Sequence, residues 1–268
     1  MILGAIYQSM GDMEESAKFL QKALATNPHL PEALFMSSIN LKDVNNANSL
    51  LQKIEKIDCK PLCVSDNSNI EFAKSNCLHK AKDYKNASDS LRKANKLKLS
   101  YMPSNAERII KTIQAIADTF TTNEAPTSEQ HCDQVFIVGA PRSGSTLLSA
   151  ILNTNPLAVN LGESKALPNA LRAYLSQGTI GNRKNLRHFY ADCINELVPP
   201  GSITIDKHLY NFMHCHHIAN CMPSAKIVHA TRNPLDNILS MLRANLVAGH
   251  SFTASAEDSA MVIIEQER

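Results

Sequence analysis

The sequence predicts an all-α region of helical hairpins followed by an α/β domain built on a parallel sheet. Apolar residues at helical spacing, interrupted by Gly11-Asp12 and ended by Asn27-Pro28, indicate the hairpins. Two segments that read as strand, turn and helix, residues 133–155 and 225–240, indicate the α/β domain. We therefore expect the first domain to span residues 1–122 and the second to span residues 133–268.

The composition of the 268-residue chain fits two soluble domains of ordinary size. Apolar residues make up 44%, and the net charge of +2 is too small to indicate a nucleic-acid or membrane partner. Seven cysteines at irregular spacing favour a reducing compartment over a disulfide framework. The N-terminal residues lack the pattern of a signal peptide, and no stretch approaches the roughly 18 apolar residues of a membrane helix. We expect a soluble, cytoplasmic protein.

The first hairpin carries a recognisable spacing of small, aromatic and proline residues. These are Gly4, Tyr7, Ser16, Leu20, Ala23 and Pro28. The spacing resembles the tetratricopeptide repeat. The pattern weakens over residues 31–61 and recovers over residues 70–99, with a degraded turn expected at Asn45, Asn46 and Asn48.

The resemblance implies stacked repeat units with a concave surface that binds a peptide or protein. A plain helical bundle without a partner is the alternative. A further helix is expected at about residues 104–120, with an apolar side formed by Ile109, Ile110, Ile113, Ile116 and Ala117. The polar, proline-containing residues 121–132 are expected to link the two domains.

A glycine loop follows the first strand of the second domain. The strand, residues 133–139, is followed by Gly139-Ala-Pro-Arg-Ser-Gly-Ser-Thr146 and an amphipathic helix. Backbone N–H groups of such a loop converge with the helix N-terminus on a phosphate. In the common nucleotide-triphosphate loop a lysine occupies the position of Ser145, so ATP or GTP hydrolysis is disfavoured. Arg142 supplies a cation instead, which fits a 5′-phosphosulfate bound without an obligatory metal.

The string Pro141-Arg-Ser-Gly-Ser-Thr-Leu-Leu148 resembles the 5′-phosphosulfate loop of sulfotransferases that use 3′-phosphoadenosine 5′-phosphosulfate (PAPS). The likeness is greatest to the tyrosylprotein group and to bacterial relatives fused to repeats, which usually have threonine where Ser145 stands. The resemblance implies that PAPS is the donor and that five loop residues bind it. They are Arg142, Ser143, Gly144, Ser145 and Thr146.

A second signature lies at residues 225–240, AKIVHATRNPLDNILS. Arg232 follows an expected strand, at the edge where α/β sheets bind ligands, and Ser240 lies about two helical turns later. The segment resembles the sulfotransferase 3′-phosphate motif, in which an arginine and a serine hold the ribose 3′-phosphate. Considered alone, Arg232 would be read as a surface cation.

Two candidate catalytic residues lie between the signatures. Glu163, in Asn-Leu-Gly-Glu, stands where the tyrosylprotein group carries its catalytic base, so the resemblance implies a base that accepts the acceptor's proton. The family's protein-sulfating members have two adjacent glutamates, of which the second is the base. Here only Glu163 is present and Ser164 follows it, so a capping or structural role is the alternative. Lys207 ends a third expected strand, residues 203–207, and resembles the family's lysine at the bridging oxygen. Asp206 is expected to orient Lys207; a solvated lysine is the alternative.

A cluster of histidines and cysteines follows Lys207. Its members are His208, His214, Cys215, His216, His217 and Cys221. Their spacing does not match a structural or catalytic zinc site, so we expect an amphipathic helix beside the sheet and no metal.

The sequence leaves the acceptor open. The predicted activity is sulfuryl transfer from PAPS to a hydroxyl or amine. The repeat fusion and the loop resemblance favour a protein or peptide as acceptor, and polysaccharide, lipid and small molecules stay open. The alternatives to this enzyme are another P-loop transferase or kinase, and a non-catalytic repeat scaffold that binds nucleotide. Residues 257–268 read as a helix without a stop signal, so we expect the sulfotransferase domain to continue beyond Arg268.

Overall fold

The computed structural model describes residues 1–118, 134–176, 185–246 and 249–268. These form two compact units. The helical unit comprises Met1–Ala106 and Leu239–Ser259, and the sheet unit comprises Glu107–Ile238 and Ala260–Arg268. The units therefore interleave along the chain, and the two consecutive domain ranges expected from the sequence stay a prediction. The expected linker, residues 121–132, lies outside the described residues.

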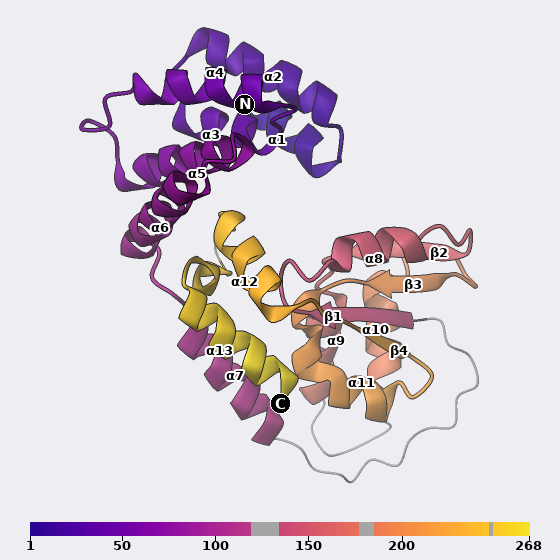
Figure 1. The fold of residues 1–268 in the computed structure, drawn as a ribbon. Coiled ribbons are helices and arrows are strands. Elements are labelled where there is room, and N and C mark those ends of the chain that lie inside the picture. The colour runs from indigo at the N-terminus through magenta and orange to yellow at the C-terminus, as the bar shows by residue number, and fades with distance from the viewer. Residues whose placement is uncertain (119–133, 177–184, 247–248) are drawn as a thin grey trace. The chain divides into compact units, whose positions relative to one another are not determined.

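The helical unit contains three helical hairpins (Figure 1). Their helices are α1 (Ile2–Ser9), α2 (Met13–Thr26), α3 (Pro31–Ile39), α4 (Val44–Glu55), α5 (Val64–Lys80) and α6 (Tyr84–Tyr101). An aspartate caps the second helix of each hairpin. Asp12, Asp43 and Asp83 accept hydrogen bonds from the backbone N–H groups three residues on.

The prediction of a degraded turn at Asn45, Asn46 and Asn48 is wrong. The turn lies before Asp43, whose Oδ1 accepts a hydrogen bond from Asn46 N at 2.8 Å. This cap starts α4 at Val44, so the asparagines lie inside the helix. A strong N-cap outweighs the weak turn preference of asparagine.

Apolar residues from successive hairpins form a continuous core. Its buried members include Leu34, Ala47, Leu50, Ile54, Ile70, Ala73 and Cys77. At the first hairpin Gly4 allows close approach of the two helices, because a Cβ there would lie 2.9 Å from Leu20 Cγ.

The segment Leu239–Ser259 is held by side chains of α6 and the residues after it. Asn95 Nδ2 donates to Leu242 O at 3.0 Å, and Asn105 Nδ2 donates to Gly249 O at 2.9 Å. Lys98 Nζ donates to Leu246 O. The Lys98 side chain is only 2% exposed, and burial lowers its pKa to about 8.

The sheet unit is built on four parallel strands in the order β2-β3-β1-β4. They are β1 (Gln134–Gly139), β2 (Ala158–Gly162), β3 (Ile203–Asp206) and β4 (Lys226–Ala230). The strands expected near residues 133–139, 203–207 and 225–230 are confirmed, and β2 is an addition that the sequence pattern did not reveal. Because all pairings are parallel, the carboxyl ends of all four strands meet at one edge.

Helices cover both faces of this sheet (Figure 1). On one face α8 (Ser145–Leu152) packs through Leu148 and Leu152 against Ile137 and Ile205. The other face, around Phe136 and Val138, is covered by three helices. They are α9 (Ala166–Leu175), α10 (Leu186–Ile194) and α11 (Cys215–Cys221).

Three further α-helices, besides two short 3₁₀ helices at Leu209–His214 and Ser251–Ala254, complete the described chain. They are α7 (Ala106–Asp118), α12 (Pro234–Arg243) and α13 (Ala256–Glu267). The expected helix at residues 104–120 corresponds to α7, and Gln114 Nε2 on it donates to Glu265 Oε1 on α13 at 3.1 Å. Together the units give the expected order of an all-α repeat region and an α/β domain.

Candidate functional site

The loop between β1 and α8 is shaped by backbone conformations that glycine favours. Gly139 has a φ of +146°, and a Cβ on it would lie 2.5 Å from Ala230 O on β4. Glycine is therefore required where β1 and β4 approach. Gly144, at φ +98°, ends the loop and precedes α8. Between them Arg142 has a left-handed φ of +67°, which is unusual for a residue with a side chain.

The loop presents polar groups suited to an anion. Ser143 is only 9% exposed, and its Oγ has no hydrogen-bond partner among the described residues. Such a group costs free energy unless a ligand or water satisfies it. No side chain caps the N-terminus of α8, and the N–H groups of its first turn point out of that end of the helix, toward the loop. Ser145 is buried, whereas Arg142 and Thr146 are exposed.

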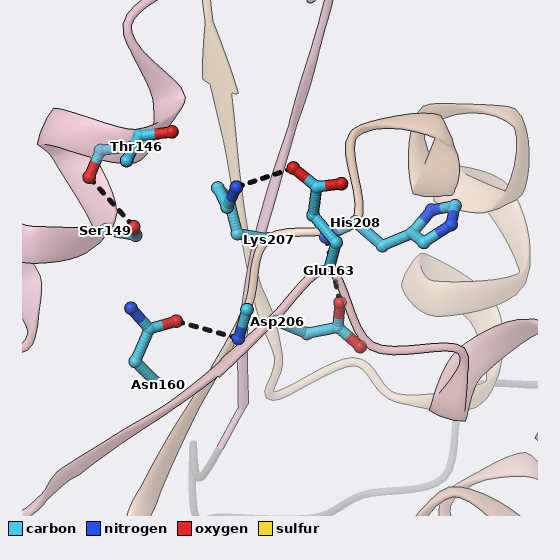
Figure 2. Close-up of polar contacts among 8 residues, drawn as sticks. Thr146, Ser149, Asn160, Glu163, Asp206, Lys207 and His208 are labelled. Carbon is cyan, nitrogen blue, oxygen red and sulfur yellow. Dashed lines mark hydrogen bonds and ion pairs between the residues drawn. The ribbon is translucent and has the colours of Figure 1, made fainter. Parts of the chain in front are cut away.

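Glu163 and Lys207 form an ion pair at the carboxyl edge of the sheet (Figure 2). They follow the adjacent strands β2 and β3, and Lys207 N donates to Gly162 O at 2.8 Å. Lys207 Nζ lies 2.8 Å from Glu163 Oε1. The lysine side chain is 11% exposed and the glutamate side chain 62% exposed. A buried ammonium is thus paired with a carboxylate that is open to solvent.

Asp206 has partners other than Lys207, so it does not orient the lysine directly as expected. Consecutive strand residues point to opposite faces, and Asp206 is fully buried on the face that α10 covers. Its carboxylate accepts hydrogen bonds from Tyr190 Oη at 3.2 Å, Asn211 Nδ2 at 3.2 Å and His208 N at 3.1 Å. These bonds fix the backbone that leads into Lys207. Burial raises the pKa of Asp206 to about 6, although the three donors oppose the shift.

Arg232 and Ser240 occupy the second signature. Arg232 is exposed in the turn between β4 and α12, and Asn233 caps that helix by accepting a hydrogen bond from Leu235 N at 3.0 Å. Ser240 is half-buried in the second half of α12. Arg232 belongs to the sheet unit, and the helical unit begins again at Leu239. The shared 3′-phosphate role of the two residues stays a prediction from the sequence.

Asn237 was missed by the sequence reasoning. It lies on α12, is 3% exposed, and donates from Nδ2 to Pro141 O in the glycine loop at 2.7 Å. An asparagine inside a helical pattern carries no signal of such a contact. Only the position of β4 beside β1 brings the two segments together.

The histidine cluster does not lie on a single amphipathic helix. His208 precedes a short 3₁₀ helix, Leu209–His214, and the members after His214 lie on α11. His216 Nε2 and His217 Nε2 lie 3.2 Å apart. Burial, followed by the nearby His217 and His208, lowers the pKa of His214 to about 4. Across the described residues, no three His, Cys, Asp or Glu side chains are arranged to hold a metal ion. The helices of the described ranges also include none with the length and apolarity to cross a membrane.

Comparisons with known proteins agree with this architecture. Residues 134–264 match the model of the sulfotransferase family, and residues 1–30 match a tetratricopeptide repeat. A curated relative from Aquifex aeolicus (strain VF5), named as an uncharacterized protein, is 24% identical over 275 residues. The match covers 94% of this chain but only 36% of that relative, so the chain spans about a third of its length. No solved structure gives a significant match. The chain thus joins a tetratricopeptide repeat to a domain that matches the sulfotransferase family.

Proposed function

We propose that the sheet unit binds PAPS and transfers its sulfuryl group to a hydroxyl or amine of an acceptor. The observation that carries this proposal is the meeting of two features at one edge of the sheet. The glycine loop follows β1, and the Lys207–Glu163 pair follows the adjacent β3 and β2. A phosphate-binding loop beside a cation and a carboxylate is what an in-line transfer from a phosphosulfate requires.

The loop fits the 5′-phosphosulfate group of the donor. Ser143 Oγ needs a partner, the uncapped N-terminus of α8 favours negative charge, and the exposed Arg142 adds a cation. Gly144, Ser145 and Thr146 contribute N–H groups and hydroxyls at the start of the helix. In the same proposal Arg232 and Ser240 hold the ribose 3′-phosphate, and no metal takes part.

For a hydroxyl acceptor, transfer proceeds by attack of its oxygen on sulfur. The new S–O bond forms as the bond between sulfur and the bridging oxygen breaks. The electron pair stays on the bridging oxygen of the departing adenosine 3′,5′-bisphosphate. The acceptor's proton passes to Glu163, and Lys207 stabilises the charge that grows on the bridging oxygen. Lys207 must therefore exchange its bond to Glu163 for contact with the donor.

The acceptor that we favour is a protein or peptide. The helical unit, which begins with a tetratricopeptide repeat, supports this choice because stacked repeats offer long surfaces to peptide partners. The relationship to the tyrosylprotein group rests on the sequence resemblance alone.

Nucleotide selectivity tests the proposal. Calorimetry without magnesium should show adenosine 3′,5′-bisphosphate binding more tightly than AMP, with ATP weaker than both. Arg232→Ala should remove the preference over AMP, whereas Arg172→Ala, an exposed arginine on α9, should keep it. Tight magnesium-dependent ATP binding would instead support a kinase. Selective nucleotide binding without transfer of radiolabelled sulfuryl groups into a cell lysate would support a scaffold.

A further inference from the structure

We propose that Asn237 is a positioning residue of the glycine loop, and that it sets the direction of the Arg142 N–H group. The inference rests on the proposed function, because it assigns this N–H group to the 5′-phosphosulfate. Asn237 lies 96 residues from Pro141 in the chain, is 3% exposed, and donates to Pro141 O at 2.7 Å. This is a short, buried hydrogen bond to the backbone of the loop.

The geometry of the peptide bond transmits this contact. Pro141 C=O and Arg142 N–H belong to one planar trans peptide unit, so they point in opposite directions. Fixing the carbonyl oxygen toward Asn237 therefore fixes the N–H group away from it. Backbone N–H groups of a glycine loop bind an anion only when they converge, and a rotated peptide would aim a carbonyl oxygen at the anion.

The backbone at Arg142 needs such a restraint. Its φ of +67° is a left-handed conformation that residues with a Cβ disfavour. Inside the loop, Ser143 N donates to Ala140 O at a long 3.3 Å. That bond joins the peptide units on either side, whereas the shorter bond from Asn237 acts directly on the Pro141–Arg142 peptide.

Asn237 is itself held by the start of α12. Asn233 Oδ1 accepts a hydrogen bond from Leu235 N, and Asn237 N donates to Asn233 O at 2.9 Å. Arg232 immediately precedes this capped turn. One short segment thus carries both the proposed 3′-phosphate arginine and the side chain that orients the 5′-phosphosulfate loop.

The test separates the two phosphate sites with three ligands. These are AMP, which has only the 5′-phosphate, adenosine 3′-monophosphate, and adenosine 3′,5′-bisphosphate. Asn237→Leu keeps a side chain of similar branched shape but removes the donor. We expect AMP and the bisphosphate to bind about tenfold more weakly, while affinity for the 3′-monophosphate is unchanged. Ile194→Val, a change in the buried core of the same unit, should leave all three affinities unaltered.

Each other result overturns the inference in a distinguishable way. Wild-type AMP affinity in Asn237→Leu would show that the loop does not need Asn237. An equal loss for all three ligands would show a role in general stability only. Failure of the wild type to bind any of them would overturn the proposed function and this inference together. If Asn237→Leu does not fold, Asn237→Ala, which also removes the donor and favours the helix, gives the same comparison.

Discussion

Lys207 Nζ donates a hydrogen bond to Glu163 Oε1 at 2.8 Å, across 44 residues of sequence. The two residues were expected to act separately, one on the leaving group and one on the acceptor. Because they pair with each other, the bond must break before Glu163 can accept the acceptor's proton or Lys207 can contact the leaving group. Because the glutamate side chain is 62% exposed, it can move away without unpacking the core, whereas the lysine is fixed by its buried stem.

Glu163→Gln should therefore impair turnover without impairing nucleotide binding. Loss of a general base typically costs at least about 100-fold in rate. We expect a fall of that order in sulfuryl transfer from radiolabelled PAPS, with adenosine 3′,5′-bisphosphate affinity within about twofold of wild type. Lys207→Ala should give the same split, because its contact strengthens in the transition state. Full activity in Glu163→Gln would assign the base to another group.

Two substitutions at Arg142 separate its charge from its backbone. Arg142→Ala keeps a Cβ at a φ of +67°, whereas Arg142→Gly removes it. Both should weaken nucleotide binding by the same factor, because both lose the guanidinium. The glycine variant should be more stable than the alanine variant by about 1 kcal/mol, measured by urea unfolding. Equal stabilities would mean that the left-handed conformation is not strained.

The raised pKa of Asp206 predicts a pH dependence of stability. Its folded-state pKa of about 6 lies above the ordinary 3.8, so the folded protein binds this proton more tightly than the unfolded chain. The stabilisation is complete below about pH 4 and is lost as the pH rises through 6, by an amount near 3 kcal/mol. Asp206→Asn should lack this loss. The histidines with lowered pKa values make stability rise over the same pH range, which opposes the effect of Asp206. The measurement is therefore the unfolding free energy of the wild type minus that of the variant, compared at pH 4.5 and 7.5.

Lys98 predicts the opposite trend in the alkaline range. Its pKa of about 8 lies below the ordinary 10.5, because burial disfavours the ammonium. The unfolded chain therefore binds this proton more tightly, and stability should rise by about 3 kcal/mol between pH 8 and 10.5. Lys98→Met should remove that rise. Parallel pH curves for wild type and variant would show that the amine is not buried in solution.

Much of the fold could be predicted because its signals are local. Periodic apolar residues mark the hairpins, and the β-branched runs that end in Gly139 and Ala230 mark two strands. The loop conformation also follows from local sequence, since Gly139 and Gly144 occupy the positions where the backbone requires them.

The contacts that organise the site could not be predicted because they depend on sheet order. Several orders of parallel strands fit the sequence pattern. The observed order places β4 beside β1 and β2 beside β3, which brings Asn237 to Pro141 and Glu163 to Lys207. For the same reason the sequence predicts that Asp206 orients Lys207, whereas in the structure Asp206 accepts a hydrogen bond from Tyr190 on α10. The short β2 was missed because its Asn160 and terminal glycine are typical of a turn.

The interleaving of the two units limits how recombination can exchange parts of such a protein between relatives. The chain leaves one unit and enters the other after Ala106, Ile238 and Ser259. A recombination event that exchanged only the N-terminal repeats would separate Asn95 and Lys98 from the carbonyl groups they bind. Those carbonyls, of Leu242 and Leu246, are main-chain groups. The side chains at these two positions can therefore be substituted while the hydrogen bonds are kept. Relatives should therefore retain Asn95 and Lys98 more strictly than the residues that they hold, and should exchange both stretches together or neither.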